Sequence, residues 1–254
     1  MTKFSANLGF LWTDISLPEA IHAAKAARFD AVECHFPFDV DPAEVKEALQ
    51  TTGLPMLGLN TRRGNVSAGD FGLAALPDRV PEARAAIDEA VIYADAINCA
   101  AIHVMAGLAK GVEAEACFIE NLRYASEKAA HQGRTILIEP INHYDAPTYF
   151  LKTTDQAVDI ITRVDADNLK LMFDCYHVQL MEGDLSNRLK RLFPQIGHIQ
   201  FAAVPDRGAP DHGEVNYRHI FKLIDDLGYT HPLGAEYKPN GPTENTLSWL
   251  QNFS

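Results

Sequence analysis

Four short stretches decide the fold: TILIEP (135–140), LKLMFD (169–174), HIQFA (198–202) and PLGAEY (232–237). Each is rich in β-forming residues and closes on a polar side chain, and these side chains are Glu139, Asp174, Gln200 and Glu236. They lie 35, 26 and 36 positions apart, close to the roughly 30 residues of one strand-plus-helix unit. Side chains at the carboxyl ends of parallel strands converge when the sheet closes into a barrel. The stretches therefore predict consecutive barrel strands with a polar site at one mouth.

The rest of the chain continues the same alternation. Strand-like and helix-like segments alternate from end to end, which is typical of an α/β fold with a parallel sheet. Besides the four stretches above, we expect strands over residues 5–12, 29–35, 54–60 and 100–105. A length of 254 residues is close to the about 250 of a (β/α)₈ TIM barrel. Because no linker or composition break divides the chain, we expect residues 1–254 to form one such barrel rather than a doubly wound open sheet.

Two polar loops follow predicted strands, at the end of a barrel where active sites lie. The first runs from Thr61 to Asp78 and is rich in Gly, Asn and Asp, and the second runs from Val204 to Asn216. Loops of this length in compact domains are often lids or binding loops. Helices are expected to start near Pro18 and Pro42, and further ones over 81–96, 113–132, 154–164, 184–193 and 217–227.

Composition narrows the classes of function. The formal net charge is −12 and the pI is near 5.2, which disfavours a sequence-independent grip on phosphate backbones. We therefore expect no nucleic-acid partner. The absence of GxGxxG and GxxxxGK[ST] motifs removes the usual support for nucleotide binding.

Cysteine usage and the N-terminus bear on the compartment. Cys34, Cys99, Cys117 and Cys175 form no CxxC pair, so they are expected to be reduced thiols. The stretch MTKFSANLGFLW lacks the basic start and long apolar run of a signal peptide. No apolar stretch approaches the ~18 residues of a membrane span. We expect a cytoplasmic protein without a membrane segment, and a homo-oligomer is compatible with this chain.

The four strand-end residues indicate metal chemistry. Three carboxylates at one point would repel each other unless a cation held them, and an all-oxygen set suits Mg²⁺, with Mn²⁺ as an alternative. Such a cation can chelate the adjacent oxygens of a hydroxy-carbonyl compound and stabilise an enediolate. Glu139 and Glu236 could then move a proton between neighbouring carbons. The pattern favours an isomerase of the aldose–ketose type.

Several stretches resemble the hydroxypyruvate isomerase family of the xylose-isomerase-like TIM barrel superfamily. The resemblance covers nearly the whole chain and is carried by LIEPINHYDAPTYFL (137–151), LMFDCYHVQLMEGDL (171–185), GHIQFAAVPDRGAPDHGEVNY (197–217), GAEYKP (234–239), SANLGFLWTDI (5–15) and GDFGLAALPDR (69–79). It implies that Glu139 and Glu236 are both metal ligands and the acid–base pair. Asp174 and Gln200 would complete the metal shell.

Further residues are candidates for substrate binding. The predicted substrate carries a carboxylate, for which Arg207 is a natural bidentate partner and Lys238 a second cation. His177 lies three positions after Asp174, and His103 ends a predicted strand, so both are expected to line the pocket. Arg62 and Arg63 in the first loop could also meet an anion, and Phe10 and Trp12 could wall the pocket.

The sequence leaves several activities open. The leading hypothesis is interconversion of hydroxypyruvate and 2-hydroxy-3-oxopropanoate (tartronate semialdehyde), and isomerisation of 2-oxo-tetronate is its close rival. A ketose 3-epimerase is a further option, although an uncharged ketose would not need Arg207. A DNA-repair enzyme such as endonuclease IV would call for a histidine-rich zinc cluster and a basic face. A barrel that only binds a metabolite would tolerate loss of the two glutamates.

Overall fold

Eight parallel strands form one sheet in the computed structural model, which describes residues 2–253. The strands are β1 (Phe4–Asn7), β2 (Ala31–Glu33), β3 (Gly58–Asn60), β4 (Ala101–His103), β5 (Thr135–Ile138), β6 (Leu169–Asp174), β7 (Ile196–Phe201) and β8 (Leu233–Ala235). Their hydrogen-bonded order is β2-β1-β8-β7-β6-β5-β4-β3. The two edges meet where Val32 bridges Met56 and the Cys34 amide donates to the Gly58 carbonyl at 3.0 Å. The sheet therefore closes, which confirms the (β/α)₈ barrel over the open doubly wound sheet.

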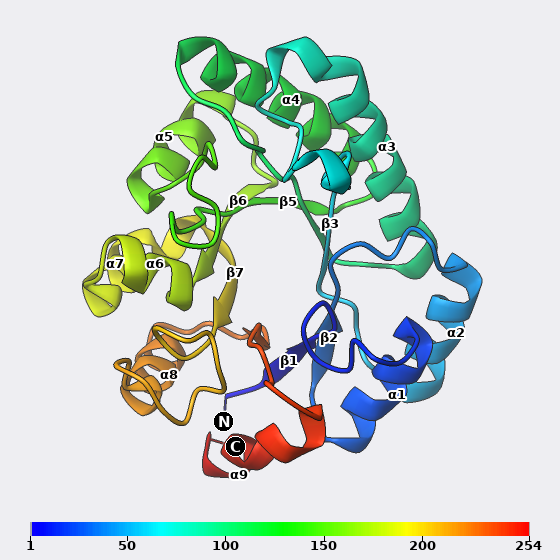
Figure 1. Ribbon diagram of the computed structural model, residues 1–254, viewed down its shortest axis with the longest axis vertical. Coiled ribbons are helices and arrows are strands. Elements are labelled where there is room, and N and C mark those ends of the chain that lie inside the picture. Colours follow the sequence, from blue (N-terminus) through cyan, green and yellow to red (C-terminus); the bar gives the residue numbers. More distant parts are fainter. Residues whose placement is uncertain (1, 254) are drawn as a thin grey trace.

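Helices form an outer ring around the strands (Figure 1). They are α1 (Leu17–Ala26), α2 (Pro42–Thr52), α3 (Val80–Ile97), α4 (Val112–Ala130), α5 (Thr154–Val164), α6 (Cys175–Met181), α7 (Leu185–Leu192), α8 (Tyr217–Asp226) and α9 (Leu250–Phe253). Ser16 caps α1 in a capping box and the Asp41 side chain caps α2, each with a proline in the first turn. The predicted starts of these two helices are confirmed.

The strands place apolar and polar layers at fixed heights in the barrel. Ile136 and Ile138 belong to the core between sheet and helices, whereas Leu137 packs with Ala101 and Met172 in a separate small cluster. Successive strand side chains point to opposite faces, so this second cluster fills the barrel interior. Two positions further along the same strands stand Glu139, His103 and Asp174. The polar site therefore lies next to this apolar cluster, on the side of the carboxyl ends of the strands.

Three expectations differ from the structure. The first strand ends at Asn7, not Trp12, because the Asn7 carbonyl accepts from the Phe10 and Leu11 amides and turns the chain out of the sheet. The second, third and fourth strands are also shorter than expected, with bounds of Ala31–Glu33, Gly58–Asn60 and Ala101–His103. A helix that was not predicted, α6, begins immediately after β6, because the Asp174 side chain accepts from the Tyr176 amide at 2.8 Å and caps it.

The first polar loop is ordered by local contacts. It contains two short 3₁₀ turns, Val66–Ala68 and Pro77–Arg79. Arg79 pairs with Asp70 at 2.7 Å across the loop. No helix within residues 2–253 is both long and apolar enough to cross a membrane.

Candidate functional site

Each strand carries a polar residue at its carboxyl end or within one position of it. We call this set the polar ring; its members are Asn7, Glu33, Asn60, His103, Glu139, Asp174, Gln200 and Glu236. All except Asn60 are buried. The sequence predicted five of these positions but missed Asn7, Glu33 and Asn60. The signal was the same in all cases, a polar residue closing a strand, but the short first three strands concealed it.

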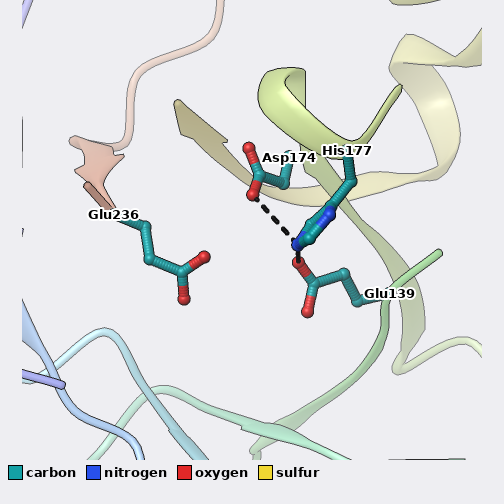
Figure 2. Close-up of side chains that lie close together, drawn as sticks. All are labelled: Glu139, Asp174, His177 and Glu236. Atoms are coloured by element: carbon teal, nitrogen blue, oxygen red, sulfur yellow. Dashed lines mark ion pairs between the residues drawn. The ribbon is translucent and has the colours of Figure 1, made fainter. Parts of the chain in front are cut away.

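Glu139, Asp174 and Glu236 meet at the mouth of the barrel together with His177. One ligand atom from each of the four lies within 4.8 Å of the others. Figure 2 shows Glu236 pointing from β8 toward the other three. His177, on the first turn of α6, places Nε2 3.6 Å from Asp174 Oδ2 and 3.7 Å from Glu139 Oε1. These residues, far apart in the sequence, therefore form one buried acidic cluster that could hold a metal ion.

Unpartnered oxygens in the site fit a divalent cation. Glu139 Oε1, Asp174 Oδ2 and Gln200 Oε1 are buried and make no hydrogen bond within residues 2–253. Gln200 lies in register with Asp174 on the neighbouring strand. Buried polar atoms are normally satisfied, so three orphaned oxygens on adjacent strands indicate a missing partner of positive charge. Carboxylate and amide oxygens are the ligands that Mg²⁺ and Mn²⁺ prefer.

The carboxyl groups of the cluster differ in their affinity for protons. Burial and the charge of Glu236 raise the pKa of Asp174 to about 8. Burial, followed by the charges of Glu236 and Asp174, also raises the pKa of Glu139 well above its usual range. Burial would raise the pKa of Glu236 too, but the Arg207 charge and a hydrogen bond with His35 lower it below its usual value. A cation that binds here must therefore displace protons from Glu139 and Asp174.

His177 is oriented by a neighbour that the sequence analysis missed. Asn142 Nδ2 lies 2.7 Å from His177 Nδ1, and the Asn142 backbone amide donates to the same atom at 3.3 Å. The Asn142 side-chain oxygen accepts from the Tyr144 and Asp145 amides, so its amide nitrogen must face the ring. Burial lowers the pKa of His177 well below its usual value, so the ring is neutral. Two donors at Nδ1 favour the tautomer with the proton on Nε2, and the 3.4 Å approach of Arg207 Nη2 to Nε2 is the longer, weaker contact. In this tautomer Nε2 is a donor that faces the cluster and not a metal ligand.

Arg207 is buried against the acidic cluster. Its Nη2 donates to Glu236 Oε2 at 2.5 Å, and its Nη1 donates to Asp145 Oδ2 at 3.1 Å. The guanidinium also contacts two aromatic rings, and the centroids of Phe10 and Tyr176 lie 4.7 and 4.9 Å from its central carbon. This predicted residue therefore holds Glu236 in place as well as bordering the cavity.

Glu236 has two further partners that were not predicted. Asn7 Nδ2 donates to Glu236 Oε1 at 3.0 Å, and His35 Nε2 lies 3.0 Å from the same oxygen. The backbone makes room for this ring, because a Cβ atom at Gly9 would lie only 2.1 Å from His35 Nδ1. Together with Arg207, these contacts fix the carboxylate in one orientation.

A cavity of about 670 Å³ opens onto the cluster. Glu139, Glu236 and His177 line it, as do the other predicted substrate-binding residues His103, Arg207 and Lys238. His103 is buried without a hydrogen bond from either ring nitrogen within residues 2–253, and burial lowers its pKa to about 3. Lys238 is exposed at the cavity.

The adjacent arginines of the first loop have different surroundings. Arg63 lines the cavity, with its guanidinium 4.6 Å from the ring centroid of Phe36, and forms no ion pair within residues 2–253. Arg62 instead pairs with Glu89 at 2.8 Å and Asp39 at 3.0 Å. Of these two arginines, Arg63 is therefore the one available to an anion in the cavity.

A model of the xylose isomerase-like TIM barrel family matches residues 21–253. The chain belongs to this family. The chain is 44% identical to the 2-oxo-tetronate isomerase of Cupriavidus necator, and the match covers 100% of this chain and 99% of that protein. It is 38% identical to the hydroxypyruvate isomerase of Escherichia coli, with all of both chains covered. These relatives confirm the predicted resemblance and the predicted isomerase class.

A solved structure shares the fold of this member of the xylose isomerase-like family. The crystal structure described as AP endonuclease, family 2, from Brucella melitensis superposes with a TM-score of 0.96 at 37% identity. The match covers 100% of this chain and 99% of the other.

Proposed function

We propose that the protein is a metal-assisted isomerase that interconverts hydroxypyruvate and 2-hydroxy-3-oxopropanoate through an enediolate. The observation that carries the proposal is the pair Glu139 and Glu236, whose carboxylates approach one point from β5 and β8 and border the same cavity. The isomerase relatives support the reaction class.

The proposed metal ligands are Glu139, Asp174, Gln200 and Glu236. The ion, with Mg²⁺ preferred and Mn²⁺ as the alternative, supplies a Lewis acid that stabilises negative charge on the substrate oxygens. His177 is left out of this set because its Nε2 carries the proton. Its Nε2 lies 3.6 Å from Asp174 Oδ2 and 3.7 Å from Glu139 Oε1, too far for a hydrogen bond to either, and is available to donate to a substrate oxygen.

Glu139 and Glu236 form the proton-transferring pair in this proposal. One carboxylate removes a proton from C3 of hydroxypyruvate, and a proton returned to C2 of the enediolate gives the aldehyde. Asn7, His35 and Arg207 hold Glu236 ionised and immobile. Arranged in this way, the pair needs no large side-chain movement between the two steps.

The substrate carboxylate is assigned to the cations around the cavity. Arg207 contributes positive charge beside Glu236, and Lys238 contributes it from the exposed side. Arg63 joins them because it lines the cavity and has no acidic partner within residues 2–253. His103, neutral and without a hydrogen bond to any residue between 2 and 253, is available to a substrate hydroxyl.

Isomerisation of 2-oxo-tetronate is the second candidate function, because the cavity is large enough for this four-carbon substrate. A volume of about 670 Å³ leaves room for a fourth carbon and its hydroxyl. The chemistry is unchanged, since a proton moves from C3 to C2 in both substrates. The identities of 44% and 38% to relatives named for the two activities do not separate them.

A nucleic-acid substrate fits the chain less well. The Brucella melitensis structure carries an AP endonuclease description, but the net charge of −12 disfavours binding to a phosphate backbone. The cluster is also built from carboxylates with a single neutral histidine.

A coupled assay tests the proposal directly. Both 2-oxo acids are offered side by side with Mg²⁺ or Mn²⁺ and again after treatment with EDTA. We expect turnover of at least one substrate, loss on chelation and recovery when metal is restored. No turnover of either substrate with either metal would defeat the proposal. A protein that only binds these metabolites would also fail to exchange their carbon-bound protons with solvent deuterium.

A further inference from the structure

Glu33 is a buried carboxylate that belongs to the polar ring but not to the acidic cluster. It ends β2, on a strand that supplies none of the proposed metal ligands, and its relative exposure is 2%. Burying a charge is costly unless it is paired or fully hydrogen-bonded. Its partners therefore indicate why the carboxylate is there.

The two oxygens of Glu33 are occupied by three side chains. Oε1 accepts from Asn7 Nδ2 at 3.1 Å and from Gln200 Nε2 at 2.9 Å. Oε2 lies 2.5 Å from His198 Nε2. These partners come from β1 and β7, so the carboxylate ties together strands on both sides of β8.

The contact with Gln200 fixes the direction of its side-chain amide. An ionised carboxylate accepts hydrogen bonds and cannot donate them. Gln200 must therefore turn its nitrogen toward Glu33, which directs its oxygen away. That oxygen is buried and has no hydrogen-bond partner within residues 2–253. A metal ligand needs this orientation, because the amide oxygen coordinates a cation and the amide nitrogen does not.

Asn7 extends the same control to Glu236. Its nitrogen donates to both Glu33 Oε1 and Glu236 Oε1, at 3.1 and 3.0 Å. Its oxygen accepts from the Gly9 amide at 2.9 Å, which fixes the direction of the amide. Glu33 thus has a contact, direct or through one side chain, with two of the four proposed ligands.

The packing leaves space for this arrangement at one glycine. A Cβ atom at Gly234 would lie 2.5 Å from Glu33 Oε1 and 2.8 Å from Gln200 Cγ. Real side chains do not approach this closely, so a larger residue would push the two groups apart. The neighbouring strand β8 is therefore built around the Glu33–Gln200 contact.

We propose that Glu33 is a positioning residue, which holds the Gln200 amide with its oxygen presented to the metal site and steadies Glu236 through Asn7. The inference rests on the proposed function for the identity of the ligands. Partners of this kind, one step removed from the metal, typically contribute about 10–100-fold to metal affinity.

The test measures Mn²⁺ binding without substrate, by electron paramagnetic resonance of the free ion. Glu33→Gln offers Gln200 an amide that can either donate or accept, so the orientation is no longer imposed. We expect Mn²⁺ binding to weaken by about 10–100-fold. Glu182→Gln is the matched control, because this carboxylate is also shielded, with a side-chain exposure of 7%, and pairs with Arg188 outside the polar ring. The control should bind Mn²⁺ as the wild type does.

A double-mutant cycle separates positioning from general damage. If Glu33 acts through Gln200, then adding Glu33→Gln to Gln200→Met should cost much less affinity than it does in the wild type. Fully additive losses, or unchanged binding in Glu33→Gln, would overturn the proposal.

Should Glu33→Gln fail to fold, a crystal structure of the wild type with Mn²⁺ decides between the outcomes. The proposal requires Gln200 Oε1 on the ion and Gln200 Nε2 on Glu33. Wild-type protein that binds Mn²⁺ but does not isomerise either substrate would contradict the proposed function alone.

Discussion

Asn142 and His177 are joined by a buried contact in which both nitrogens of Asn142 face one nitrogen of the imidazole. The distances to His177 Nδ1 are 2.7 Å from the side chain and 3.3 Å from the backbone. A neutral ring that accepts on Nδ1 carries its proton on Nε2, the atom that points at Asp174 and Glu139. This contact favours His177 as a hydrogen-bond donor to a substrate oxygen over His177 as a nitrogen ligand to a metal ion.

Replacing the side-chain nitrogen of Asn142 with an oxygen should move the proton of the His177 ring from Nε2 to Nδ1. In Asn142→Asp the new carboxylate accepts from Nδ1, so Nε2 loses its proton and can no longer donate. We expect kcat on the proposed substrate to fall by about 10–100-fold, as for other positioning partners of a site. The tautomer is read from the ¹⁵N shifts of His177. Asn187→Asp, an exposed position on α7, is the control and should change neither quantity.

The two glutamates should be separable by isotope exchange. Glu139→Gln and Glu236→Gln are each expected to lower turnover of the proposed substrate by about 10²–10⁴-fold, the usual contribution of a general acid or base. The base alone is enough to exchange the C3 proton of hydroxypyruvate with solvent deuterium. One variant should therefore keep exchange without forming product, as followed by ¹H NMR at saturating Mn²⁺. Full turnover in both variants would remove the pair from the mechanism.

The sequence predicted the second half of the barrel better than the first. Glu139, Asp174 and Glu236 could be placed together because period-two strands bring their carboxyl ends to one mouth. Asn7 was missed because the apolar residues after it, Leu8 among them, extend the strand-like pattern. Where the strand ends is set by hydrogen bonds that the Asn7 carbonyl accepts in the turn.

Roles that depend on long-range pairing were beyond the sequence. Arg207 contacts Glu236 and Asp145, which are 29 and 62 positions away, and no local pattern shows that its charge is already shared. The start of α6 was missed for a related reason. Asp174 both closes a strand and caps the next helix, so the usual loop signal between the two elements does not exist.

Metal binding should strengthen as the pH rises. Asp174 has a pKa of about 8, and the pKa of Glu139 is also raised, so protons compete with the cation below that pH. We expect Mn²⁺ affinity to increase between pH 6 and pH 8. Calorimetric titration in buffers of different ionisation enthalpy should show proton release at pH 6. Affinity that does not change with pH would contradict these pKa directions.

The carboxyl groups of Asp174 and Glu139 should also make the stability of the metal-free protein depend on pH. Their pKa values are higher in the folded than in the unfolded chain, so their stabilising effect is complete below the unfolded values near pH 4. The contribution of Asp174 is lost as the pH rises through about 8. Because a ligand that binds only the folded state stabilises it, the rise in Tm caused by Mn²⁺ should be larger at pH 8 than at pH 6. Asp174→Asn should reduce this difference.

The neighbouring arginines of the first loop allow a controlled test of where the substrate carboxylate binds. Arg63 lines the cavity, whereas Arg62 is paired with Glu89 and Asp39. A hydrogen bond to a charged group contributes about 1.5–3 kcal/mol, so Arg63→Ala should raise KM by about 10–100-fold with a smaller effect on kcat. Arg62→Ala should leave KM near the wild-type value. Arg207→Ala should instead lower kcat, because it releases Glu236. Equal effects of the two loop variants on KM would show that the carboxylate does not reach Arg63.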